Sequence, residues 1–421
     1  MGNKQNTTKS QDTSEKKEEK NVNPDVKLEH VVFDATPEIK EEAYKIERQI
    51  LENSGLQLDK EVWIDDVYID YYGKNYLHTI RCGRPEDKIE KNIVIIHGYQ
   101  GSSITFYKLF KHLYPKYNIF CPDIIGMALS SRPVVNFNTT EKWLEFFVES
   151  FEKWRQKLGI EKMHLVGHSL GGYFSALYSL SHPEVIEKLT LLSPAGITDT
   201  NQGGNVHEYM PFGKKLGFHL LGPFWSLKLT MQGMFRDNGL SKLIMKSALR
   251  KRYEVSKEEN ELLARLTELS LSYPTDLDKA IYYIFKNPIP KVNLPLEDKL
   301  YEGVKSFKVD FYFGENDWMD RAGSMRLCNK DNERFKFYTV SKYGHNFNLE
   351  NAEELALLLI EKDEKHKEKI IEDFRKKEDE QMHMIETEDL IIQKLEEENL
   401  NDNNQLANDE KNSKEFQDLN K

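Results

Sequence analysis

Short apolar runs of strand length alternate with helical patterns through the middle of this chain, and each run stops at a turn-forming or polar residue. Residues 92–96 form such a run, which ends at His97-Gly98. Further runs end at Pro122-Asp123, at Gly167 and at Ser193-Pro194. Fully apolar strands are typical of sheets covered on both faces. The alternation therefore predicts βαβ units and a parallel sheet.

The pattern changes at the start of the chain and again after its middle. Residues 67–72 and 76–82 flank a Gly-Lys-Asn turn, which predicts an opening antiparallel hairpin. From 196 to 300 no strand is obvious, and helical patterns rich in Leu, Met and aromatic residues replace the alternation. Strand patterns resume at 307–313 and 335–339. A helical cap inserted between two strands of one sheet explains this order better than two successive domains.

Polar residues are concentrated at the two ends of the chain, which explains a mean hydropathy of −0.66 for the whole sequence. Residues 1–35 hold almost no large apolar side chains and are expected to be disordered. Residues 361–421 alternate Lys and Glu and predict a charged helical or disordered tail, either exposed or part of a coiled coil. The catalytic core is expected over 36–195 and 301–360, and the cap over 196–300.

Composition and charge exclude several classes of partner. The formal net charge is −11, so the chain as a whole has no electrostatic attraction to nucleic acid or to an anionic membrane. Any contact with a membrane or lipid droplet must be local or apolar. The three cysteines, Cys82, Cys121 and Cys328, are far apart and form no CxxC motif, which predicts reduced thiols. No run approaches the ~20 apolar residues of a transmembrane helix, so we expect a cytoplasmic protein, soluble or peripheral.

One motif carries a direct prediction of chemistry. Gly167-His168-Ser169-Leu170-Gly171 fits the pattern G-x-S-x-G and lies between an apolar strand and a helical pattern. Glycines at both ends allow a turn too tight for a β-carbon, and the turn exposes the serine Oγ at a helix N-terminus, where the helix dipole stabilises an oxyanion. Ser169 is therefore the predicted nucleophile; the alternative is a chance glycine-rich turn.

Acyl chemistry also needs donors for the oxyanion of the tetrahedral intermediate. The backbone N–H of Leu170, which follows the nucleophile, is one predicted donor. The other is expected from the loop His97-Gly98-Tyr99-Gln100-Gly101, with the N–H of Tyr99 as the candidate. His97 precedes the glycine turn and is expected to brace this loop rather than to act as a base.

A serine nucleophile needs a base and a carboxylate that orients it. His345 follows the last predicted strand and is the expected base. The preceding strand ends in a loop that contains Asp317 and Asp320. Asp317, three residues after Gly314, is the leading candidate for the acid, and Asp320 is the alternative. The pattern shows no metal cluster or nucleotide loop, and the mechanism requires no cofactor.

These residues resemble the α/β-hydrolase-domain 4 and 5 branch of the α/β hydrolases, together with its yeast and plant relatives. The resemblance covers about residues 68 to 360. Its most specific part is Asp123 to Pro133, which is similar to the branch pattern D-x-x-G-x-x-x-S-S-R-P. Gly314 to Asp320 and Leu294 to Leu300 also resemble the branch. The implied fold is an α/β-hydrolase fold, with a mostly parallel sheet of the eight-stranded type, helices on both faces and an inserted helical cap.

The resemblance implies activity on acyl esters of phospholipids or lysophospholipids, with lysophosphatidic acid acyltransferase activity in some members. One branch member has Asn at the nucleophile position and acts as a lipase activator on lipid droplets, whereas Ser169 favours catalysis here. The acyltransferase pattern is H-x4-D, but Glu350 stands at that spacing after His345. We therefore rank hydrolysis above transfer.

Other functions remain open at this point. A non-catalytic lipid-droplet or lipase-regulating adaptor could keep the fold, and an esterase or peptidase could use the same triad. Epoxide hydrolases and dehalogenases are disfavoured because they would need Asp at position 169. In the cap, Phe224 and Trp225 could line an acyl channel or touch a membrane, or equally could belong to the core.

Overall fold

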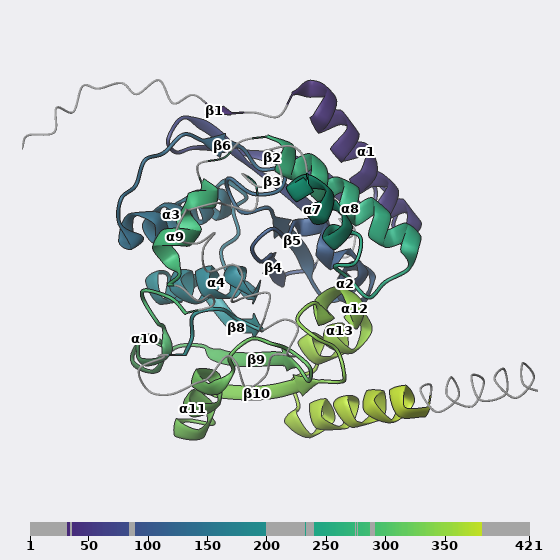
Figure 1. The fold of residues 1–421 in the computed structure, drawn as a ribbon. Coiled ribbons are helices and arrows are strands. Elements are labelled where there is room, and N and C mark those ends of the chain that lie inside the picture. The colour runs from purple at the N-terminus through teal and green to yellow at the C-terminus, as the bar shows by residue number, and fades with distance from the viewer. Residues whose placement is uncertain are drawn as a thin grey trace, which may run out of the picture.

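Eight strands form one sheet at the centre of the molecule, in the order β10-β9-β8-β7-β4-β5-β3-β2 (Figure 1). The computed structural model describes residues 32–33, 36–83, 89–198, 232, 240–273, 275, 277–286 and 291–380. The strands of this sheet are β2 (Val62–Asp70), β3 (Lys74–Cys82), β4 (Asn92–Ile96), β5 (Asn118–Pro122), β7 (Met163–His168), β8 (Ile186–Leu192), β9 (Lys308–Gly314) and β10 (Phe335–Val340).

The strand pairing confirms the predicted hairpin and the predicted parallel sheet. β2 and β3 pair antiparallel along their whole length, and β3 also pairs antiparallel with β5. All other neighbours pair parallel. Because β4, β7, β9 and β10 run in the same direction, the loops that follow them meet at one end of the sheet, where α/β proteins place their ligand sites.

Helices lie on both sides of the sheet and bury two separate apolar clusters. Val94 and Ile96 of β4 belong to one cluster, and Ile93 and Ile95 belong to the other. Successive side chains of a strand point to opposite faces, so each cluster fills one face. The helices that complete the core are α1 (Pro37–Asn53), α2 (Tyr107–Leu113), α3 (Thr140–Lys157), α4 (Leu170–Ser181), α11 (Ala322–Lys330), α12 (Phe347–Glu350) and α13 (Ala352–Ile360).

The segment between β8 and β9, called the cap below, is an insertion into the sheet's chain path. β8 and β9 are direct parallel neighbours, with Leu189 opposite Val309. The cap therefore leaves the sheet after one strand and returns at the adjacent one. Its described helices are α7 (Leu240–Leu249), α8 (Lys257–Ser272), η6 (Leu277–Ala280), α9 (Ile281–Ile284) and α10 (Glu297–Gly303).

Little of the expected N-terminal tail is described. Val32–Phe33 (β1) pairs antiparallel with Arg132–Pro133 (β6). The other residues before 36 lie outside the described residues, as do residues 381–421. Within the described part of the chain, no helix is long and apolar enough to cross a membrane.

The charged C-terminal segment begins with a helix over residues 364–380, which contacts the sheet (Figure 1). The Nζ of Lys367 lies 2.7 Å from the Asp310 carboxylate and 2.7 Å from the Tyr312 hydroxyl, and only 2% of Lys367 is exposed. Burial lowers the pKa of Lys367 to about 8, although the charge of Asp310 opposes this shift. A buried ion pair therefore ties this helix to β9.

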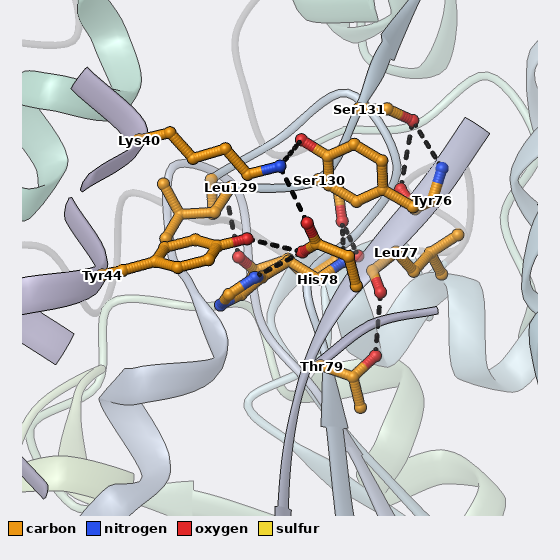
Figure 2. A network of polar contacts seen from close by, with 12 residues as sticks. Lys40, Tyr44, Tyr76, Leu77, His78, Thr79, Leu129, Ser130 and Ser131 are labelled. Atoms are coloured by element: carbon orange, nitrogen blue, oxygen red, sulfur yellow. Dashed lines mark hydrogen bonds and ion pairs between the residues drawn. The ribbon is translucent and has the colours of Figure 1, made fainter. Parts of the chain in front are cut away.

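A buried ionic network attaches α1 to the hairpin, and Figure 2 shows Lys40 reaching toward Tyr76 and Tyr44 lying beside His78 of β3. His78 Nε2 lies 2.8 Å from the Glu47 carboxylate, and its Nδ1 lies 3.0 Å from Asp66. Asp66 also accepts hydrogen bonds from Lys40 at 2.8 Å and from Tyr44 at 2.6 Å. Burial alone would lower the pKa of His78, but the two carboxylates raise it to about 10. His78 is therefore a buried imidazolium.

Replacing this imidazolium should loosen α1. In His78→Gln, the fully buried Glu47 carboxyl, whose pKa burial already raises, loses the cation that compensates its charge. Breaking a buried ion pair costs about 3–5 kcal/mol, so the melting temperature should fall by more than about 5 °C in calorimetry. The matched control is Arg48→Gln on α1. Arg48 forms an exposed ion pair with Asp59, and such a pair contributes about 0–1 kcal/mol.

The same variant tests the protonation of His78. The folded pKa of about 10 lies above the ordinary value of 6.5, so the charged form stabilises the fold fully below pH 6.5. That stabilisation is lost as the pH rises through about 10. The difference in melting temperature between the wild type and His78→Gln should therefore shrink between these two pH values. A constant difference across that range would show that His78 is neutral.

Candidate active site

The turn between β7 and α4 holds Ser169 in an unusual backbone conformation. Ser169 has φ 56° and ψ −118°, a region that residues other than glycine seldom occupy. Its N–H donates to the Leu192 carbonyl at 2.9 Å, and its own carbonyl accepts from the N–H of Ala195 at 3.0 Å. These bonds to the end of β8 and to the loop after it hold the strained turn in place.

Two glycines let the backbone approach this serine closely. A β-carbon at Gly171 would lie 2.6 Å from the Ile96 carbonyl oxygen, which is too close for any side chain. A β-carbon at Gly98 would lie 2.8 Å from the β-carbon of Ser169. Glycine at 171 therefore brings α4 against the end of β4, and glycine at 98 brings the loop after β4 over Ser169.

His345 and Asp317 form a hydrogen-bonded pair beside this turn. His345 Nδ1 lies 3.0 Å and 3.3 Å from the two carboxylate oxygens of Asp317, which is 1% exposed. Asp317 also accepts from the Met319 N–H at 2.9 Å and from the Ser193 hydroxyl. Burial would raise the pKa of Asp317, but His345 and these donors outweigh it and hold the pKa below its usual value. Asp317 is therefore an ionised carboxylate that occupies Nδ1 and leaves Nε2 of His345 for proton transfer.

Asp320 occupies a different position in the same loop. Its Oδ1 accepts from the N–H of Ala322 at 2.9 Å, at the start of α11. Of the two carboxylates that the sequence left open, the structure brings Asp317 to His345. Within the described residues, Asp320 makes no hydrogen bond to the histidine.

His168, inside the turn motif, joins the Ser169 turn to the loop that carries His345. Its Nε2 lies 2.8 Å from the carbonyl oxygen of His345. Burial and the nearby charge of His345 lower the pKa of His168 to about 3, so the ring is neutral and its Nε2–H donates to this carbonyl. Trp318 also packs against the His345 ring, with ring centroids 5.0 Å apart. These two contacts fix the position of the His345 loop.

The loop after β4, residues 97–101, is called the oxyanion loop below. His97 is fully buried; its Nδ1 lies 2.8 Å from the Gly98 carbonyl, and its Nε2 accepts from the Ile124 N–H at 2.9 Å. Burial lowers the pKa of His97, so it is neutral and Nδ1 carries the proton. Gly98 O also accepts from the N–H of Gly101 at 3.0 Å. Because the C=O and N–H of a trans peptide point in opposite directions, these bonds orient the N–H of Tyr99.

A cavity of about 400 Å³ brings four predicted site residues together. Ser169, Leu170, Tyr99 and His345 all line it, and Asp317 lies buried behind His345. Its other lining includes apolar residues and four charged residues: Ala195, Ile281, Phe285, Trp318, Met319, Lys251, Arg252, Glu254 and Glu350. Phe224 and Trp225, which the sequence suggested for substrate binding, lie outside the described residues.

The segment from Asp123 to Pro133 attaches the cap to the core. Asp123 accepts two backbone N–H bonds, at 2.6 Å and 2.9 Å, that shape the loop after β5. Arg132 is 2% exposed and donates to the carbonyls of Ser270 at 3.0 Å and Tyr273 at 3.1 Å, at the end of α8. Sequence reasoning identified this segment only as a resemblance. Its partners lie about 140 residues away, so no local pattern could reveal its role in cap attachment.

A parallel sheet that presents a serine at a strand–helix turn, beside a histidine–aspartate pair, defines the class of serine-nucleophile α/β hydrolases. The chain belongs to the α/β-hydrolase fold family, whose model matches residues 91–352.

Curated relatives carry the names of lipid enzymes. The chain is 26% identical over 284 residues to the 1-acylglycerol-3-phosphate O-acyltransferase of Arabidopsis thaliana, covering 64% of this chain and 65% of that protein. It is 30% identical over 173 residues to the human 1-acylglycerol-3-phosphate O-acyltransferase ABHD5, covering 36% and 49%. It is 33% identical over 129 residues to the mouse (lyso)-N-acylphosphatidylethanolamine lipase, covering 31% and 37%. The chain thus spans two thirds or less of the length of these relatives, and its resemblance to the ABHD4 and ABHD5 branch is confirmed.

Proposed function

We propose that this chain is a serine hydrolase that cleaves acyl esters of phospholipids or lysophospholipids. Ser169 is the nucleophile, His345 the base, and Asp317 the carboxylate that orients it. The observation that carries the proposal is the hydrogen-bonded pair of His345 and Asp317. His345 and Ser169 line the same partly apolar cavity. The names of the lipid-acting relatives support the substrate class.

The geometry suggests how each group acts. Nε2 of His345 takes the proton of Ser169 as Oγ attacks the ester carbonyl, and then returns it to the leaving alcohol. The backbone N–H groups of Tyr99 and Leu170 stabilise the oxyanion. Leu170 is the first residue of α4, so the helix dipole adds to this stabilisation. Water then hydrolyses the acyl-enzyme.

Acyl transfer is the second candidate, because the Arabidopsis relative carries an acyltransferase name. It would need the hydroxyl of a lysophospholipid, such as lysophosphatidic acid, in place of water at the acyl-enzyme. Glu350, the residue at the spacing of the acyltransferase pattern, accepts the N–H of Glu254 at 3.0 Å. That bond gives Glu350 a role in holding the cap. We therefore keep hydrolysis, rather than acyl transfer, as the first candidate reaction. A non-catalytic adaptor is disfavoured because the complete constellation is retained.

The proposal predicts the products of one direct assay. The purified chain is incubated with a mixed phospholipid extract and lysophosphatidic acid, and lipids are followed by mass spectrometry. The wild type should release free fatty acid, and Ser169→Ala should lose at least about 10³-fold in rate along with labelling by a fluorophosphonate. New phosphatidic acid without fatty acid would make transfer the main reaction. A folded wild type that neither labels nor turns over lipid would support the adaptor instead.

The two candidate acids make separable predictions. Asp317→Asn should lower kcat by about 10⁴-fold, because an amide holds the wrong tautomer of His345. Asp320→Asn is the matched control from the same loop, and its kcat should stay near the wild-type value because Asp320 bonds a backbone N–H instead of the base. Turnover of a soluble ester, normalised to folded protein by circular dichroism, measures both. A larger loss in Asp320→Asn would reverse the assignment.

We also propose that α7 touches an anionic lipid surface, which would make the protein peripheral on a membrane or droplet. Leu243 and Ile244 are 66% and 59% exposed and lie side by side on this helix. Lys242 and Lys246 flank them, and Lys246 also pairs with Glu268 of α8 at 3.3 Å, so the apolar pair has positive charge beside it. Such a face binds the interface of a bilayer that contains anionic lipids. Residues 251–254, just after α7, line the cavity.

Flotation with vesicles tests this contact. The double variant Leu243→Gln and Ile244→Gln should lose most binding to vesicles containing phosphatidylserine, because two buried side chains contribute about 1.5–3 kcal/mol each. Met325→Gln is the control, since Met325 is an exposed apolar residue on α11, outside the cap. Equal flotation of the double variant and the control would exclude α7 as the lipid contact.

A further inference from the structure

The oxyanion loop is held from two sides, by the core and by the cap. We infer that Arg252 and Asp278, two cap residues, are positioning residues that hold the oxyanion loop in its reactive shape. The cap thereby sets the reactivity of Ser169 as well as covering it. This inference rests on the proposed serine chemistry, because it concerns the donor that would stabilise the oxyanion.

Asp278 holds the side chains of the oxyanion loop. One of its carboxylate oxygens accepts from the Tyr99 hydroxyl and, at 3.2 Å, from Nε2 of Gln100. Its other oxygen accepts from the backbone N–H of Gln232 at 3.3 Å. Asp278 is 3% exposed, so water does not replace these donors easily. Burial and the charge of Asp278 raise the pKa of Tyr99, which keeps its hydroxyl protonated as a donor.

Arg252 holds the backbone of the same loop. Its Nη1 donates to the Gln100 carbonyl at 2.6 Å, and its Nη2 lies 3.5 Å from the Tyr99 carbonyl. The backbone oxygen of Arg252 accepts from Asn346 Nδ2 at 3.3 Å, next to the base. The cap segment over 252–254 therefore bonds the oxyanion loop on one side and the His345 loop on the other.

These cap contacts matter because the oxyanion loop is strained. Gln100 has φ 54°, a left-handed conformation that persists only where its surroundings hold it. The peptide before Tyr99 is oriented from the core through His97. The next two carbonyls are held from the cap by Arg252, and the side chain of Tyr99 is held by Asp278. Release from the cap would let Tyr99 turn its N–H away from the oxyanion.

A purely structural role for Asp278 is the competing explanation. Arg132 is buried in the same region, and the charge of Asp278 opposes the fall that burial causes in its pKa. Asp278 could therefore serve only as a counter-charge to Arg132. The two roles differ in one measurable respect. A counter-charge affects how much protein folds, whereas a positioning residue affects the rate at each folded site.

The experiment measures kcat and KM with a soluble short-chain ester on the full chain, per active site titrated with a fluorophosphonate. The variants are Asp278→Asn, Arg252→Lys and Tyr99→Phe, which deletes the hydroxyl but keeps the backbone N–H. Lys279→Gln, exposed and adjacent to Asp278, is the control. We expect kcat to fall about 10-fold to 100-fold in Asp278→Asn and Arg252→Lys. In Asp278→Asn, KM should stay within about 2-fold, because Asp278 does not line the cavity. Affinity for a trifluoromethyl ketone, which mimics the tetrahedral intermediate, should fall in parallel with kcat.

A double-mutant cycle identifies the path of the effect. If Asp278 acts through Tyr99, the combined variant Tyr99→Phe with Asp278→Asn should be no slower than Asp278→Asn alone. Tyr99→Phe also keeps the test valid if Asp278→Asn fails to fold, since it preserves the charge of Asp278. Variants with wild-type kcat per titrated site, or with only a raised KM, would overturn the inference while leaving the proposed function intact. A wild type that does not react with the fluorophosphonate would overturn the proposed function itself.

Discussion

The site depends on one close approach between backbones, where the oxyanion loop, the nucleophile turn and the end of β4 meet. Gly98 and Gly171 stand at this point, and a β-carbon at either would lie within 2.8 Å of its neighbour. No side chain can move aside to relieve such an overlap, because Gly171 faces the backbone of Ile96. The contact therefore sets Ser169 relative to the peptide of Tyr99. The histidine, the carboxylate and the cap are all arranged around this fixed pair.

Much of the core was predictable because its signals are local. The strand runs, the opening hairpin and the turn around Ser169 are each written in one short stretch of consecutive residues, and the structure contains all of them. The sequence could not decide which carboxylate lies beside His345, since Asp317 and Asp320 follow the same strand and only the path of the loop separates them. The partners of Arg132 and Asp278 were invisible for another reason. Their contacts join segments more than 130 residues apart, and the local hydrophobic periodicity of a sequence cannot predict such contacts.

Three buried charges outside the site share one architectural role. His78 binds α1 to the hairpin, Lys367 binds the helix 364–380 to β9, and Arg132 binds the end of α8 to the loop after β5. Each charge is removed from water, which is costly unless several partners compensate it. Such sites contribute little net stability but penalise any arrangement that leaves the charge unpaired. They therefore specify where each peripheral element docks on the sheet.

Hydrogen bonds from the cap likewise hold the two loops beside Ser169. The His345 loop is held by His168 from the nucleophile turn and by the Arg252 backbone from the cap. The oxyanion loop is held by His97 from the core and by Arg252 and Asp278 from the cap. Displacing the segment around Arg252 would remove bonds from both loops at once. The position of this one cap segment therefore affects both loops together.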